Sequence, residues 1–288
     1  MNGFQSLLLV LLMVPVFIYH GFPIERVTSK YFHLMCAAIF LSYGQALLSL
    51  VLSHATEPST LSTKGNTGNP LVDLFHGREL NPILLGANLK LQTFRCSMVG
   101  LALLNTLLVT EACLTKGVNP TVVIAATYQI LYALDAMYYE DCYFYSHDSL
   151  YSGFGWSLIS SYLTFPFLPT LVTRYLVAAS PALHWAALAA ITTMNLLGYY
   201  IYRNSENQRC QLAKDPSHPS LAHLTTLEGA KGRRLITSGW WGLVRHPNYL
   251  GELLVQWSWV LPAAPTLGLA QLVPYYLPVI TTLMLVLR

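Results

Sequence analysis

The residues best suited to chemistry lie in one segment, 128–156, that begins inside an apparent hydrophobic span. Ionisable groups at membrane depth are costly, and they usually face a bundle interior or a watery cavity. A carboxyl group in apolar surroundings has a raised pKa and can donate a proton. The segment therefore predicts a cavity that supplies protons; in the alternative interpretation, the span ends near Met137 and the acids face water. The ionisable residues are Asp135, Glu140, Asp141, His147 and Asp148.

A second polar group precedes the last hydrophobic stretch, where residues 238–252 read SGWWGLVRHPNYLGE. The proline in this sequence disfavours helix at the residue before it, so a helix is expected to restart near Asn248. Asn248 and Tyr249 would then offer polar groups at a helix start, and either tryptophan could stack on a planar ring. The alternative is an interfacial belt, because Trp, Tyr, Arg and His are common at membrane surfaces.

The composition indicates that membrane helices position these residues. Hydrophobic residues make up 54% of the 288 and charged residues only 10%, whereas soluble domains carry about 25% charged residues. This excludes a disordered chain, a coiled coil and an ordinary soluble enzyme. We expect an all-α, polytopic transmembrane bundle of about 7–9 spans. The expected spans are 4–22, 31–53, 98–115, 118–138, 155–178 and 182–202, followed by a block at 250–287 that prolines divide into two segments.

Charge distribution gives the expected orientation and partners. The polar loops 54–97 and 203–236 carry most of the Lys and Arg residues, so both are expected to be cytosolic. The net charge of +3 is too small to indicate nucleic-acid binding. No Cys or His residues have metal-ligand spacing, and no metal site is expected. Residues 1–288 are expected to form a single integral-membrane domain.

Several stretches in the same order resemble the sterol reductase family, which includes the Δ14-sterol reductases and the membrane domain of lamin B receptor. The resemblance covers the chain from about residue 66 onward. The stretches that carry it are GNPLVDLFHGRELNP (68–82), YQILYALDAMYYED (128–141), GFGW (153–156), DPSHPSLAHLTT (215–226) and LITSGWWGLVRHPNYLGELL (235–254).

The resemblance implies an NADPH-dependent Δ14-sterol reductase in the endoplasmic reticulum membrane, the inner nuclear membrane or both. A sterol would enter from the bilayer lipids, and NADPH would bind in a cytosol-facing pocket in the C-terminal half. The 14,15 double bond would be protonated and would then accept a hydride. The alternative is a non-catalytic scaffold or sterol-binding protein of the same membranes, similar to lamin B receptor.

The resemblance carries the family's site residues over to nine positions of this sequence, of which eight hold the family's usual residue. In the sterol cavity, the resemblance assigns catalytic roles to Tyr139, Glu140, Asp141 and Asp148. On the cofactor side, within residues 203–288, it assigns NADPH contacts to Arg209, Ile236, Trp241, Asn248 and Tyr249, where Arg209 replaces the family's usual Lys.

Three departures support the non-catalytic alternative. Ala213 stands where the family places an Arg for the cofactor phosphates. The segment 94–100, FRCSMVG, lacks most of a Glu-x-Arg-Pro-Gly run. The family also continues beyond residue 288 with a stretch that contributes an Asp, an Arg and a Tyr to the cofactor pocket, so the cofactor-side portion is expected to be truncated.

Overall fold

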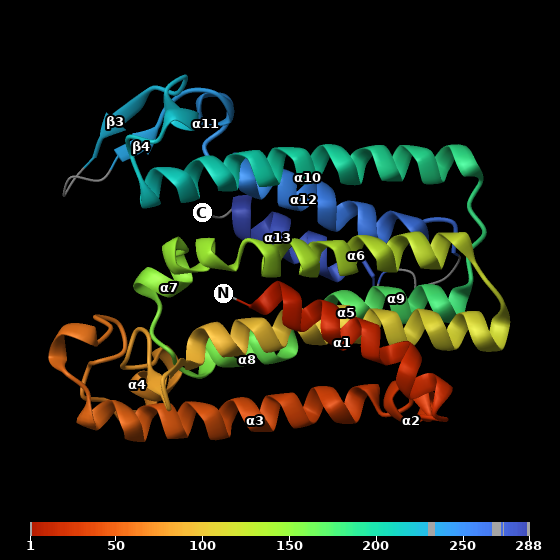
Figure 1. Cartoon of the computed structure of the whole chain (residues 1–288), viewed down its shortest axis with the longest axis horizontal. Coiled ribbons are helices and arrows are strands. Elements are labelled where there is room, and N and C mark those ends of the chain that lie inside the picture. The colour runs from red at the N-terminus through yellow and green to blue at the C-terminus, as the bar shows by residue number, and fades with distance from the viewer. Residues whose placement is uncertain (1, 230–233, 267–271, 273, 287–288) are drawn as a thin grey trace. The chain divides into compact units, whose positions relative to one another are not determined.

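A computed structural model describes residues 2–229, 234–266, 272 and 274–286, and these residues form a mostly helical protein (Figure 1). The all-α expectation is therefore confirmed. Within the described residues, three helices are long and apolar enough to cross a membrane: α3 with the turn that follows it (Tyr31–Ala55), α5 (Leu89–Lys116) and α6 (Pro120–Tyr138). Helix α1 (Gly3–Tyr19) is apolar but shorter. The full set of 7–9 spans remains a prediction.

The chain divides into two compact units. The first contains residues 1–118 and 129–177, and the second contains 119–128 and 178–288. In addition to α1, α3 and α5, the first unit holds α2 (Ile24–Thr28), α4 (Pro70–His76), the two-stranded pair β1 (Ile83–Leu84) and β2 (Ala87–Asn88), the 3-10 helix Glu140–Tyr145, α7 (His147–Tyr151), α8 (Trp156–Thr164) and most of α9 (Phe167–Ala179).

Helix α5 begins nine residues earlier than the sequence pattern predicted. The Asn88 side chain accepts a hydrogen bond from the main-chain N–H of Leu91 and caps the helix at Leu89. As a result, Lys90 and Arg95, which we expected in a polar loop, lie in the first two turns of a long helix. The core around this helix includes Leu7, Met98, Leu101 and Met137.

The expected single span at 155–178 is wrong, because the chain forms two helices, α8 and α9, separated at Phe165 and Pro166. Pro166 has no N–H to donate to the carbonyl four residues earlier, and a helix loses a bond at such a position.

Close backbone packing in the first unit depends on glycines. The segment 153–155 crosses the end of α4 so closely that a Cβ atom on Gly77 would lie 2.1 Å from the Gly155 nitrogen. The Phe154 N–H donates to the Glu79 carbonyl at 2.8 Å beside this crossing. Two of the family-like stretches, 68–82 and 153–156, therefore meet through their main chains.

The second unit is built around two long helices. Helix α10 (Trp185–Lys214) packs along α12 (Pro247–Val260), and a Cβ atom on Gly251 would lie 2.6 Å from the Gly198 carbonyl oxygen. The unit also holds the start of α6, the antiparallel pair β3 (Thr226–Glu228) and β4 (Arg234–Ile236), α11 (Trp240–Leu243) and α13 (Tyr276–Val286).

Helix α10 continues twelve residues beyond the predicted end of its span. Residues 203–214 contain no glycine or proline and are rich in good helix formers, so the helix extends until Asp215, directly before a proline. Arg209 therefore lies on a helix and not in a loop. By contrast, the predicted restart near Asn248 is confirmed, because α12 begins at Pro247.

Candidate functional site

The acidic segment is anchored by an ion pair that the sequence pattern did not reveal. Glu140 is only 3% exposed, and its carboxylate accepts hydrogen bonds from Arg95 Nε at 2.7 Å and Arg95 Nη2 at 2.9 Å. The main-chain N–H of Gly3 donates to the same carboxylate at 3.0 Å. Because Glu140 is buried, the interpretation in which the acids simply face water is wrong for this residue.

These contacts correct the expected chemistry of Glu140. Burial by itself raises the pKa of the Glu140 carboxyl, but the hydrogen bonds from Arg95 and Gly3 and the Arg95 charge outweigh it and lower the pKa. Glu140 therefore stays charged at neutral pH and is poorly suited to donate a proton. Arg95 lies 45 residues away along the chain, so the local sequence around Glu140 shows the burial but not the partner.

Tyr139 and Asp141 flank this buried carboxylate, and both are partly buried. Helix α6 ends at Tyr138, and the chain continues as a 3-10 helix from Glu140 to Tyr145. Within α6, Asp135 is buried whereas Tyr138 is 64% exposed, so these two residues lie in different surroundings although they are three positions apart.

Asp148 belongs to a second polar group. The Tyr162 hydroxyl donates to Asp148 Oδ2 at 3.1 Å, and the hydroxyls of Tyr162 and Tyr143 lie 3.2 Å apart. Tyr143 belongs to the same 3-10 helix as Glu140. The two tyrosines therefore connect Asp148 to the acidic segment.

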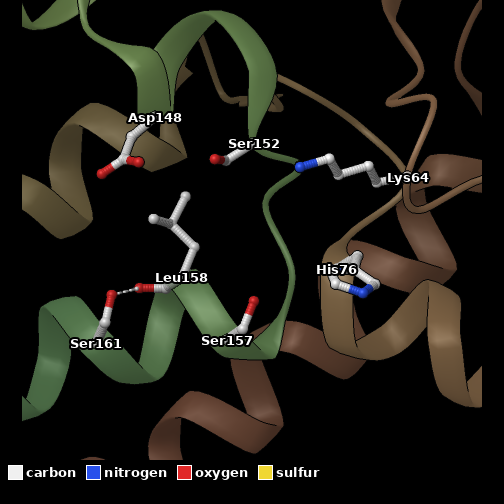
Figure 2. Close-up of a pocket in the computed structure, with 8 residues that line it drawn as sticks. Lys64, His76, Asp148, Ser152, Ser157, Leu158 and Ser161 are labelled. Carbon is white, nitrogen blue, oxygen red and sulfur yellow. Dashed lines mark hydrogen bonds between the residues drawn. The ribbon is translucent and has the colours of Figure 1, made fainter. Parts of the chain in front are cut away.

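Asp148 also lines a pocket of about 270 Å³ (Figure 2). Asp148 and Ser152 lie at one side, and the Lys64 side chain extends toward Ser152 from the loop that precedes α4. The pocket thus combines a carboxylate, a cation and hydroxyl groups, which suits a polar group on a ligand. The remaining lining residues are His76, Gly153, Ser157, Leu158 and Ser161.

Lys90 holds the main chain around Asp148 in place. Its side chain is fully buried, and Nζ donates to the carbonyl oxygens of Leu80 at 2.8 Å and Ser152 at 2.6 Å. The Asp148 carbonyl also accepts from this ammonium, and the Ser149 carbonyl lies 3.4 Å away. A single cation from α5 thus fixes the segment 148–152.

Replacing Lys90 with methionine is expected to lower the free energy of unfolding by about 2–5 kcal/mol, because the buried Leu80 and Ser152 carbonyls lose their donor. Thermal or denaturant unfolding in detergent micelles measures the change. The matched control is Lys116→Met at the other end of α5, where the Lys116 Nζ donates a solvent-exposed hydrogen bond to the Val177 carbonyl oxygen. Equal stability of Lys90→Met and the parent chain would contradict this account.

In the second unit, Glu206 joins two of the predicted cofactor residues. Its Oε2 accepts from Arg209 Nε at 3.0 Å and from Nη2 at 2.6 Å, and its Oε1 accepts from Asn248 Nδ2 at 2.7 Å. Arg209 lies on α10 and Asn248 on α12, so the packed helix pair brings them together. Glu206 was not among the predicted site residues, although its i,i+3 spacing to Arg209 indicates a helical ion pair.

The other predicted cofactor residues lie in the same unit. Ile236 ends β4 and pairs with Thr226. Trp241 lies in α11, a short helix that contacts both α10 and α12. The Tyr249 ring lies 5.0 Å from the His246 ring, measured between centroids. The contacts do not test whether all five residues bind one ligand, and that assignment remains a prediction.

Two of the buried polar atoms without a hydrogen-bond partner among the described residues belong to predicted cofactor residues, Asn248 Oδ1 and Trp241 Nε1. Buried polar groups are normally paired, so this orphaned acceptor and this orphaned donor are available to a water molecule or a polar ligand. No three His, Cys, Asp or Glu side chains lie together as a metal site in the part of the chain that the structure covers.

These features define the class of protein, which is α-helical and has helices long enough to span a membrane. One unit contains the acidic segment with its ion pair, and the other contains Glu206 bonded to Arg209 and Asn248. The chain belongs to the ergosterol biosynthesis ERG4/ERG24 family, whose sequence profile matches residues 1–288. The resemblance to the sterol reductase family is thereby confirmed.

Three curated relatives show how far the similarity extends. The chain is 35% identical to Delta(14)-sterol reductase TM7SF2 of Mus musculus, over 100% of this chain and 68% of the relative. It is 30% identical to Delta(14)-sterol reductase LBR of Gallus gallus, over 96% and 43%. It is 32% identical to Delta(14)-sterol reductase erg24 of Schizosaccharomyces pombe, over 96% and 65%. The chain therefore spans 43–68% of the lengths of these relatives.

Proposed function

We propose that this chain is an NADPH-dependent Δ14-sterol reductase that reduces the 14,15 double bond of a sterol intermediate in the endoplasmic reticulum or inner nuclear membrane. The observation that carries the proposal is the family match over residues 1–288, together with the Delta(14)-sterol reductase activity for which its relatives are named. The apolar helices fit a substrate that enters from bilayer lipids.

We assign the proton-delivering role to Tyr139 and Asp141. Glu140 and Arg95 form a closed ion pair that fixes the start of the 3-10 helix, and the two flanking residues are thereby held in place. Asp148 accepts a hydrogen bond from Tyr162, whose hydroxyl lies 3.2 Å from that of Tyr143 in the acidic segment. In this proposal Glu140 positions the donor and does not itself donate.

On the cofactor side, Arg209, Ile236, Trp241, Asn248 and Tyr249 would hold NADPH, which supplies the hydride when bound. Arg209 provides a charge for phosphate, and the Trp241 ring provides a surface for stacking. The orphaned Asn248 Oδ1 and Trp241 Nε1 provide an acceptor and a donor for the ligand.

The test is reduction of a Δ8,14 sterol by the purified chain in lipid nanodiscs with NADPH. The expected product carries two additional hydrogen atoms by mass spectrometry; in D₂O one of them is deuterium, because the proton comes from solvent through the protein. Sterol binding without NADPH binding or product formation would instead support the alternative, a non-catalytic scaffold or sterol-binding protein.

Replacing Asp141 with asparagine is expected to lower kcat by about 10²–10⁴ with little change in sterol affinity, because the variant loses a proton-transfer group and keeps its shape. Glu57→Gln is the matched control, since Glu57 is exposed and lies outside the proposed site. Unchanged turnover in Asp141→Asn would remove Asp141 from the proposed mechanism.

A further inference from the structure

Glu206 has no role in the proposed reaction, yet both of its carboxylate oxygens are in use. One oxygen accepts two N–H groups of Arg209, at 3.0 and 2.6 Å, and the other accepts the Asn248 amide at 2.7 Å. The Glu206 side chain is 15% exposed and the Arg209 side chain 32%. An anionic ligand bound to Arg209 and Asn248 would accept hydrogen bonds from the same N–H groups that Glu206 now occupies.

The backbone keeps this arrangement in place. Helices α10 and α12 approach closely where Gly251 packs against Gly198 and the main chain of Tyr202. A hydrogen bond of 2.7 Å from Asn195 Nδ2 to Ser258 Oγ joins the same helices farther along. Because the two helices are packed this closely, a rotation of the Glu206 side chain is the simplest movement that separates its carboxylate from Arg209 and Asn248.

The charges of Glu206 and a ligand phosphate have the same sign. A phosphate that binds the Nε/Nη2 edge of Arg209 must replace the Glu206 carboxylate, because this carboxylate already accepts hydrogen bonds from both of these nitrogens. Until Glu206 turns away, its negative charge also repels the incoming phosphate. Ala213, one turn further along α10, contributes no charge that could compensate.

We propose that Glu206 is an internal counter-anion that a nucleotide phosphate displaces from Arg209, and that it thereby sets the affinity of this site for NADPH. The proposal rests on the proposed function, since it takes Arg209 and Asn248 as cofactor residues. It assigns to Glu206 a specificity-determining role, in which the carboxylate weakens the binding of phosphate-bearing ligands. Before such a ligand binds, the same carboxylate holds Arg209 and Asn248 in position.

The experiment is equilibrium binding of NADPH to the full chain in nanodiscs, followed by energy transfer from tryptophan to the dihydronicotinamide. Glu206→Gln keeps the size of the side chain and removes its charge, and it is expected to tighten NADPH binding about ten- to hundredfold. The matched control is Glu228→Gln, which removes one exposed negative charge from β3 and is expected to leave the dissociation constant unchanged.

Two further variants test the mechanism. In an Arg209→Gln background, Glu206→Gln is expected to give no gain, because the competition is for the Arg209 guanidinium. Glu206→Asp retains the charge and is expected to tighten binding less than Glu206→Gln. Glu206→Ser serves as the neutral variant if Glu206→Gln does not fold, as judged by thermal unfolding and size-exclusion chromatography.

The outcomes separate this proposal from the proposed function. Unchanged or weaker NADPH binding by the neutral variants, with a parent chain that binds, overturns the role of Glu206 alone. Absence of NADPH binding in the parent and every variant overturns both. Parallel titrations with NADH then show which phosphate competes with Glu206. Tighter binding of both NADH and NADPH by the neutral variants supports competition at the pyrophosphate. Tighter binding of NADPH alone supports competition at the 2′-phosphate.

Discussion

Replacing Arg95 with methionine is expected to lower the free energy of unfolding by about 3–5 kcal/mol, because the variant leaves the buried Glu140 carboxylate without its partner. Unfolding in detergent micelles, followed by circular dichroism, measures the loss at neutral pH. The bond from Gly3 remains, but one main-chain N–H does not compensate a charge that is 3% exposed.

The effect of Arg95→Met should depend on pH. In the parent chain the folded-state pKa of Glu140 is depressed, so the stability it contributes is present above the unfolded pKa and is lost as pH falls through the folded value. Without Arg95, burial raises the folded-state pKa of Glu140, so the variant gains stability as the carboxyl protonates. The stability difference between the two proteins is therefore expected to shrink as pH falls.

A second substitution serves as the control for Arg95→Met. Adding Glu140→Gln removes the uncompensated charge and is expected to restore part of the lost stability, so the double variant should be more stable than Arg95→Met alone. If Arg95→Met unfolds like the parent chain at every pH, the ion pair does not anchor the acidic segment.

Replacing Gly77 with alanine is expected to lower the free energy of unfolding by more than about 4 kcal/mol or to prevent folding. Gly77 has a φ of +79°, which side chains disfavour, and its added methyl group would lie 2.1 Å from the Gly155 nitrogen. The main chain at 153–155 cannot withdraw freely, since the Phe154 N–H is bonded to the Glu79 carbonyl.

Gly117→Ala separates backbone strain from the steric clash. Gly117 has a similar φ of +85°, but a Cβ atom there would meet nothing within 4 Å. This control is expected to cost about 1–3 kcal/mol, the strain alone. Expression level and thermal unfolding of the two variants give the comparison, and equal losses at the two positions would show that the crossing at Gly77 adds nothing.

The Gly77 crossing also bears on the candidate site. The segment 153–155 follows directly after Ser152, whose carbonyl accepts from Lys90, and Ser152 lines the pocket beside Asp148. A displaced segment would therefore change the pocket as well as the fold. We expect Gly77 variants that still fold to lose more of the proposed sterol-reducing activity than Gly117 variants do.

The sequence by itself determined the class of fold and the family. Hydropathy is a local property, so the apolar helices α3 and α6 could be predicted to within a few residues, and the start of α12 followed from one proline. The order of the family-like stretches was also visible without coordinates. The start of α5 and the end of α10 were not predicted, because polar and charged residues there belong to a helix whose hydropathy is too low for a membrane span.

Only the tertiary structure decided which charges meet. Glu140 finds Arg95 across 45 residues, and Asn248 finds Glu206 across 42. Spacing along the chain carries no information about such pairs, whereas the local sequence shows only that a carboxyl lies in apolar surroundings and predicts a raised pKa. For Glu140 the partner reverses this direction, because the charge and hydrogen bonds of the partly buried Arg95 guanidinium, together with the Gly3 N–H, stabilise the carboxylate more than burial destabilises it.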